Sequence, residues 1–98
     1  MGRIAVTDGM APQAINRLIE AGHEVIEGSI EANLLEAGAL SGFDAIIIRS
    51  ATILDASVIG SSKGLKVIGR AGVGVDNIDI DAATANDVVV VNAPQAST

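Results

Sequence analysis

Short apolar runs recur along the chain, separated by stretches in which apolar residues return at helical spacing. Five runs are short and rich in Ile and Val, which is typical of strands in a parallel sheet. They predict strands at 4–7, 24–27, 44–48, 65–69 and 88–91. The strongly apolar run at 44–48 is expected to be central, whereas the charged ends of 24–27 suit a sheet edge.

The stretch after the first run predicts a helix whose beginning and end are both marked. Pro12 suits the first helical turn, because its missing N–H has no intrahelical partner there. Ile15, Leu18 and Ile19 follow at the spacing that places them on one helical face. Gly22 then suits the position just past the helix end, where a positive φ is common.

Short polar side chains predict the beginnings of three further helices. Ser29 is the expected N-cap of a second helix, which stops at Gly38. Asp55 is the expected N-cap of a third helix, and Asp79 of a fourth over 82–85. Such side chains accept hydrogen bonds from N–H groups that the first helical turn leaves unpaired.

Strand and helix alternate throughout, so the chain is expected to form an α/β fold with a doubly wound, parallel, five-stranded sheet. The expected strand order is 2-1-3-4-5, the flavodoxin-like arrangement, in which ligands bind at the carboxyl ends of the strands. The composition of 88–91 predicts a strand buried on both faces, yet 92–98 offers no final covering helix. The sequence therefore looks cut, unless another chain provides the cover.

Composition excludes several classes of partner. The chain has 98 residues, enough for one domain, with a net charge of −6 and one aromatic residue, so a nucleic-acid partner is not expected. It has no cysteine and one histidine, which argues against a metal site. No apolar run is long enough for a membrane span and no secretion signal is evident, so a soluble cytoplasmic protein is expected.

Candidate chemistry follows two of the predicted strands. The segment 69–79 reads Gly-Arg-Ala-Gly-Val-Gly-Val-Asp-Asn-Ile-Asp, and its glycines leave main-chain N–H groups open to an anion. Arg70 lies in that segment, while Arg49 and Ser50 follow the strand at 44–48. Because the carboxyl ends of neighbouring parallel strands meet at one edge, these groups predict a pocket for a small acid.

These features also have plainer interpretations. The glycines could serve only a tight turn, and Arg49 could be a surface residue at a sheet edge. Gly72 and Gly74 suggest a dinucleotide loop, but Asn77 holds the place of its third glycine and the loop follows the fourth strand. A receiver domain needs an aspartate where Arg49 stands, and a flavin site needs stacking aromatics, so neither is expected.

Other polar residues are expected to play structural roles. His23 follows the turn at Gly22, at the opposite end of the sheet from the candidate pocket, and is expected to be a solvated surface residue. Asp44 opens its strand and so should lie at the opposite end from Asp8. Asp79 and its acidic neighbours most simply serve a helix N-terminus.

Four segments carry a resemblance to a known family. They are 46–52 (Ile-Ile-Ile-Arg-Ser-Ala-Thr), 65–79, 82–84 (Ala-Ala-Thr) and 91–94 (Val-Asn-Ala-Pro). In this order and spacing they closely resemble the D-3-phosphoglycerate dehydrogenases, a branch of the D-isomer-specific 2-hydroxyacid dehydrogenases. The resemblance extends over essentially the whole chain.

The resemblance implies that 1–98 is the N-terminal part of a substrate-binding, or lid, domain, and that a Rossmann domain for NAD lies outside this chain. It implies that the Val73 and Gly74 amides, in the loop with Gly72, hold the carboxylate of a phosphorylated 2-hydroxy acid. Arg49 and Ser50 would face the substrate, including its phosphate. Val73 and the segment that begins at Asn92 would border the nicotinamide.

The activity implied for the whole enzyme is oxidation of 3-phosphoglycerate to 3-phosphohydroxypyruvate, at the entry to serine biosynthesis. The family's catalytic arginine, glutamate and histidine would lie beyond Thr98, so the isolated chain is expected to be inactive and to hold no cofactor. The alternative is a non-catalytic structural module that self-associates through its uncovered face, as a homodimer or by exchange of an element.

Overall fold

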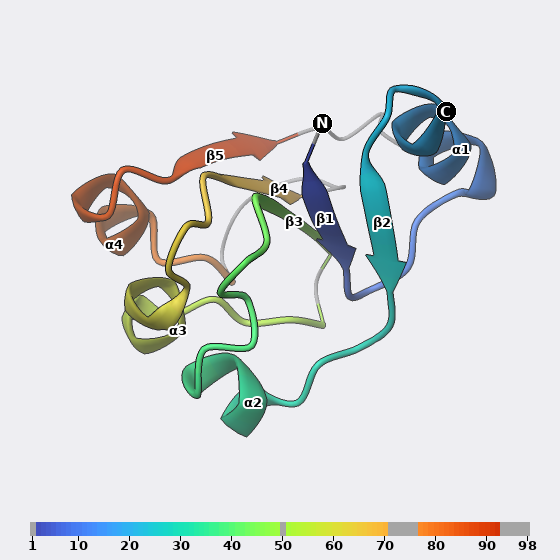
Figure 1. The fold of residues 1–98 in the computed structure, drawn as a ribbon. Coiled ribbons are helices and arrows are strands. Elements are labelled where there is room, and N and C mark those ends of the chain that lie inside the picture. The colour runs from blue at the N-terminus through green and yellow to red at the C-terminus, as the bar shows by residue number, and fades with distance from the viewer. Residues whose placement is uncertain (1, 50, 71–76, 93–98) are drawn as a thin grey trace.

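The computed structural model describes residues 2–49, 51–70 and 77–92, in which five strands alternate with four helices (Figure 1). Each predicted element is present within these residues, with its bounds shifted by at most a few positions. In chain order they are β1 (Arg3–Val6), α1 (Pro12–Glu20), β2 (Glu24–Glu27), α2 (Ala32–Glu36), β3 (Ala45–Ile48), α3 (Ala56–Ser61), β4 (Val67–Arg70), α4 (Ile80–Ala85) and β5 (Val89–Asn92).

The strands form one parallel sheet in the order β2-β1-β3-β4-β5, which confirms the predicted flavodoxin-like topology. The apolar strand β3 is central, and β2 with its charged ends lies at one edge. Ile46 in β3 pairs with Ala5 on one side and Ile68 on the other, and all three are buried. The register therefore aligns the most apolar positions of three strands on one face.

Helices cover the two faces unequally. Figure 1 shows α2, α3 and α4 together on one side of the sheet, while α1 lies beside β2. The main core lies under those three helices, where Ile46, Ile48 and Ile68 have no exposed surface. Helix residues that complete this core include Leu35, Val58, Ile59 and Ala83.

The face that carries α1 is less well covered toward β5. Val67 in β4 pairs with Val89 in β5, and Val91 lies on the same face two residues further on. These valines are 36%, 59% and 45% exposed. The prediction of a last strand buried on both faces was therefore wrong, because Val88 and Val90 face the core while Val89 and Val91 are exposed.

Backbone hydrogen bonds explain where α1 ends. Gly22 has a φ of +94° and donates to the Ile19 carbonyl at 3.0 Å, and His23 donates to the Leu18 carbonyl at 3.1 Å. This pair of bonds satisfies carbonyls that the last helical turn leaves open, and it needs a residue that tolerates the left-handed region. Gly22 thus ends the helix as predicted, although Ile19 is 52% exposed and does not join the buried face.

Side-chain caps were predicted correctly at two helices and wrongly at one. Asp55 accepts a hydrogen bond from the Val58 N–H, and Asp79 accepts one from the Ala82 N–H, each at 3.0 Å. Ser29 does not cap α2, since that helix begins after Glu31 without a side-chain cap. A plausible cap residue was present in the sequence, but the chain turns into the helix two residues later.

Candidate functional site

The ends of β3 and β4 meet at one edge of the sheet, named here the carboxyl edge. Ile48, the last residue of β3, pairs with Arg70, the last residue of β4. Arg49, which follows Ile48 and is exposed, therefore lies at the same edge as Arg70. Asn92 ends β5 there too, because it pairs with Arg70 on the other side.

Several of the predicted substrate contacts cannot be placed. Ser50, Gly72, Val73 and Gly74 lie outside the described residues, so their roles stay predictions. The strand that leads to Ser50 and the strand that leads to the glycine loop are nevertheless adjacent and parallel. Both strands therefore end at the carboxyl edge.

Asp8 links the end of β1 to the residues that follow β3. Its Oδ2 accepts hydrogen bonds from the backbone N–H of Arg49 at 2.8 Å and from that of Thr52 at 3.0 Å. Its Oδ1 accepts one from the Thr52 hydroxyl at 2.5 Å. The buried hydroxyls of Thr7 and Thr52 are also hydrogen-bonded, at 2.8 Å. One carboxylate thus takes up three donors from the chain just beyond β3.

These bonds set the charge state of Asp8. Burial by itself raises the pKa of the carboxyl, because the charged form loses water. Hydrogen bonds from Thr52, Arg49 and Thr7 outweigh this effect and lower the pKa below its ordinary value of 3.8. Asp8 is therefore ionised at neutral pH, and its bonds to Arg49 and Thr52 are charge-assisted.

Asn77 holds the same segment from the other side. Its Nδ2 donates to the Arg49 carbonyl at 2.8 Å and to the Thr52 carbonyl at 2.6 Å. Its Oδ1 accepts a hydrogen bond from the Arg70 Nε at 2.8 Å. A single amide side chain therefore joins the residues beyond β3 to the last residue of β4.

Main-chain bonds fix Asn77 in turn. Its carbonyl accepts a hydrogen bond from the Leu54 N–H at 2.8 Å, and the Leu54 carbonyl accepts one from the Asp79 N–H at 2.9 Å. Leu54 and Ile78 form a parallel bridge and are both buried. The Asn77 side chain is thus presented from a backbone that is anchored in the core.

Sequence reasoning did not assign Asp8, Thr52 and Asn77 to the site. For Asp8 the sequence predicts only a place at the opposite end of the sheet from Asp44, and for Asn77 only that it replaces a third glycine. Asp8 lies 41 and 44 positions from Arg49 and Thr52, and Asn77 lies 28 and 25 positions from them, beyond the reach of any local pattern. The available signal was the rule that polar residues following parallel strands gather at one edge.

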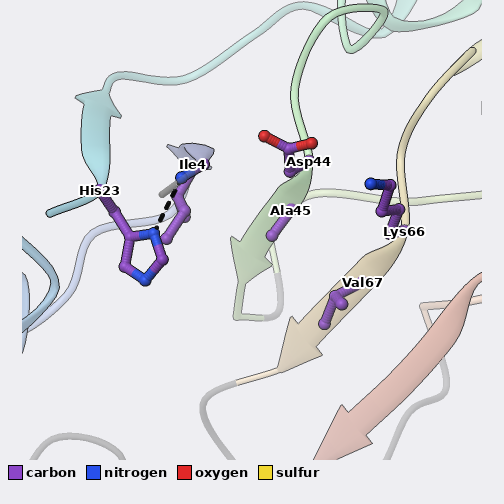
Figure 2. Close-up of a pocket in the computed structure, with 7 residues that line it drawn as sticks. Ile4, His23, Asp44, Ala45, Lys66 and Val67 are labelled. Carbon is purple, nitrogen blue, oxygen red and sulfur yellow. Dashed lines mark hydrogen bonds between the residues drawn. The ribbon is translucent and has the colours of Figure 1, made fainter. Parts of the chain in front are cut away.

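The opposite end of the sheet, named here the amino edge, contains a hollow of about 300 Å³ (Figure 2). It is lined by Gly2, Ile4, His23, Asp44, Ala45, Lys66 and Val67. Asp44 lies there, at the opposite end from Asp8, as predicted. His23 also lies at this edge, but it is half-buried and its Nδ1 accepts a hydrogen bond from the Gly2 N–H at 3.1 Å, so it is not simply a solvated residue.

The described residues contain neither a metal-binding cluster nor a membrane span. No group of three or more His, Asp or Glu side chains within 2–49, 51–70 and 77–92 is arranged to hold a metal ion. Over the same ranges, every helix is too short or too polar to cross a bilayer.

Comparison with known proteins gives a consistent result. Residues 4–98 match the family described as D-isomer specific 2-hydroxyacid dehydrogenase, catalytic domain. The chain is 48% identical over 98 residues to a D-3-phosphoglycerate dehydrogenase of Methanocaldococcus jannaschii, with 99% of this chain and 18% of that protein covered. It is 43% identical to the Bacillus subtilis D-3-phosphoglycerate dehydrogenase, with 100% of this chain and 18% of that protein covered.

Solved structures agree. The crystal structure of NAD⁺-bound 3-phosphoglycerate dehydrogenase from Entamoeba histolytica is similar with a TM-score of 0.78 and 32% identity, over 93% of this chain and 32% of that one. The chain thus spans 18% of the length of the curated relatives named above. Nearly the whole sequence matches the family, and the sheet topology agrees with it, so the chain belongs to the D-isomer specific 2-hydroxyacid dehydrogenases.

Proposed function

We propose that this chain forms the N-terminal part of the substrate-binding domain of an NAD-dependent D-3-phosphoglycerate dehydrogenase. Arg49 and Ser50, with the backbone at Gly72, Val73 and Gly74, bind the anionic 2-hydroxy acid. The observation that carries the proposal is the pairing of Ile48 with Arg70, since it brings the Arg49 segment and the start of the glycine loop to one edge. The high identity to D-3-phosphoglycerate dehydrogenases supports the choice of substrate.

The chemistry of this edge suits a small dianion. A guanidinium binds a carboxylate or phosphate through two parallel hydrogen bonds, and exposed backbone N–H groups add neutral donors. The net charge of −6 opposes anion binding in general, so binding must depend on local groups. Arg49 and Arg70 both come from strand ends at this edge.

The loop after β4 is a poor match for a dinucleotide phosphate cradle. The place of the third glycine holds Asn77, whose side chain is committed to Arg49, Thr52 and Arg70. We therefore expect the rest of the enzyme to hold the NAD phosphates. When bound, NAD supplies the hydride acceptor, and Asn92, exposed at the carboxyl edge, together with Val73 would border its nicotinamide.

The isolated chain is proposed to be catalytically inactive. Oxidation of a 2-hydroxy acid needs a base for the hydroxyl proton, and the one histidine of the sequence, His23, lies at the amino edge. The experiment incubates the purified chain with 3-phosphoglycerate and NAD and follows NADH absorbance. We expect no NADH above background, and measurable turnover would contradict this part of the proposal.

Substrate binding is tested separately. Titration of the ¹⁵N-labelled chain with 3-phosphoglycerate should give saturable NMR shifts near Arg49, with a Kd on the order of millimolar. Arg49→Ala should abolish these shifts, whereas Arg17→Ala in α1 serves as a matched control for the loss of one positive charge. Equal shifts in both variants would exclude Arg49 from the site.

The exposed valines of β4 and β5 support a second function, self-association of a non-catalytic module. Val67, Val89 and Val91 form an apolar strip on the less covered face of the sheet. Pairing two such strips would remove this apolar area from water. Light scattering over a range of concentrations decides this, since a mass that stays that of a monomer rules the second function out.

A further inference from the structure

Side chains form hydrogen bonds with both main-chain polar groups of Arg49. Its N–H donates to the Asp8 carboxylate and its carbonyl accepts from the Asn77 amide, at 2.8 Å each. Both peptide groups are therefore fixed by side chains, and the two side chains come from different strand exits. Asp8 follows β1, and Asn77 follows the loop that β4 enters.

The same two side chains also fix Thr52. Asp8 accepts from its N–H and hydroxyl, and Asn77 donates to its carbonyl. The chain is thus held at both Arg49 and Thr52, on either side of Ser50. Donors and acceptors are complementary, because the acceptor-only carboxylate meets N–H and O–H groups while the amide donors meet carbonyls.

Asn77 also links this segment to Arg70, the last residue of β4. Arg70 and Asn77, which both belong to the segment 69–79, are joined by the bond from Nε to Oδ1 at 2.8 Å. Arg49, Arg70 and Asn77 are consequently parts of one hydrogen-bonded unit.

We propose that Asp8 and Asn77 are positioning residues that hold the Arg49 backbone in place for the anionic substrate. The inference rests on the proposed function of Arg49. Arg49 has a long, exposed side chain. When its backbone is already fixed, substrate binding no longer has to remove the conformational entropy of that backbone. Loss of the Asp8 or the Asn77 side chain should weaken binding of 3-phosphoglycerate about tenfold while Arg49 itself is still present.

The direction in which anion affinity changes distinguishes a positioning role of Asp8 from a purely electrostatic one. Removing a negative charge near an anion site would by electrostatics tighten anion binding. A positioning role predicts the opposite change, weaker anion binding. Asp8→Ala should therefore bind 3-phosphoglycerate more weakly than the wild-type chain, and Asp8→Asn, which keeps one acceptor oxygen for the N–H groups, should fall between them.

The experiment titrates 3-phosphoglycerate into the labelled wild-type chain and into Asp8→Ala, Asp8→Asn and Asn77→Ala. Controls are Asp44→Ala, which removes a carboxylate that accepts the Arg3 N–H, and Asn86→Ala, which removes an amide that donates to the Ala82 carbonyl. Both controls lose a similar bond away from the carboxyl edge. All titrations are made where circular dichroism shows the variant to be folded.

Backbone ¹⁵N relaxation at Arg49 provides a readout that needs no ligand. We expect raised mobility at Arg49 in Asp8→Ala and Asn77→Ala, unchanged mobility in both controls, and a matching loss of affinity only in the first pair. If the wild-type chain binds 3-phosphoglycerate, and Asp8→Ala and Asn77→Ala bind it equally well with Arg49 still ordered, the positioning proposal is overturned and the proposed function stands. If the wild-type chain shows no saturable shift, the proposed function fails and the positioning role fails with it.

Discussion

The two ends of the sheet use a similar residue in different ways. At the carboxyl edge, Asp8 accepts three hydrogen bonds from Arg49 and Thr52, and Asn77 bonds to the same segment. At the amino edge, Asp44 accepts one bond, from the Arg3 N–H, beside the open hollow of Figure 2. Asp8 and Asn77 thus link the ends of three strands at the carboxyl edge, whereas the Asp44 carboxylate at the amino edge links β3 to β1 through one bond.

The difference teaches where a parallel sheet can support chemistry. Strand exits at the carboxyl edge lead into segments that must turn back to a helix, so their peptide groups lack strand partners. Side chains such as Asp8 and Asn77 can satisfy these groups and, in doing so, immobilise the residues that carry them. A rigid edge presents a charged side chain with little loss of entropy on binding.

The largest expected effect is that of Asp8→Ala. It leaves two N–H groups and a hydroxyl without their acceptor, and we expect it to lower the free energy of unfolding by about 3 kcal/mol. Asp44→Ala loses one accepted bond and should cost about 1 kcal/mol. Urea denaturation measures both values. Equal losses in the free energy of unfolding would mean that Asp8 stabilises its edge no more than Asp44 does.

Asn77→Ala should have the next largest effect. It removes two donors from the carbonyls of Arg49 and Thr52 and an acceptor from Arg70, for an expected loss of about 2 kcal/mol. Asn86→Ala, which removes one donor at the end of α4, should lose less than about 1 kcal/mol. Thermal and urea unfolding of the two variants side by side gives the comparison, and a larger loss in Asn86→Ala would contradict it.

Thr52→Val tests the hydroxyl alone. The replacement keeps the shape of a buried side chain but removes the donor to Asp8 and the partner of Thr7, so we expect a loss of about 1 kcal/mol. The backbone bond from residue 52 to Asp8 would remain. Ser57→Ala on α3 is the control, because it also removes one hydroxyl but at an exposed position. A stabilised Thr52→Val chain would show that the hydroxyl pair is not a favourable contact.

Acid should weaken the carboxyl edge once it protonates Asp8. The pKa of Asp8 is lowered in the folded state relative to 3.8, so its contribution to stability is present above that value and is lost as pH falls through the folded pKa. The wild-type chain should therefore lose stability below pH 3.8 more steeply than Asp8→Asn. Urea unfolding as a function of pH measures this, and parallel curves would refute it.

The smallest effect on stability is expected on the uncovered face. Val91 is 45% exposed, so Val91→Thr should change the free energy of unfolding by less than about 0.5 kcal/mol. Ile68→Thr in the neighbouring strand, at a position with no exposed surface, should cost far more. A large cost for Val91→Thr would indicate that this face is covered in solution, in agreement with self-association.

Fold and site differed in how far the sequence could predict them. The strands and their order followed from apolar runs and the βαβ rule, and the Asp55 and Asp79 caps followed from local pattern. The prediction of Ser29 as a cap failed, because the helix begins after Glu31 and has no side-chain cap, so cap preference did not set its start. Sequence patterns predict best those interactions, such as helix caps and the faces of helices and strands, that join residues only a few positions apart.

What the sequence by itself determined is the alternation of strand and helix, the family motifs, and the placement of Arg49 at the end of a buried strand. Only the tertiary structure decided that Asp8 and Asn77 hold Arg49 from two sides, and that Val89 and Val91 of β5 stay exposed. The reason is distance along the chain. Periodicity reports which face of an element is apolar, but a hydrogen bond between residues 41 positions apart exists only once the strands have paired.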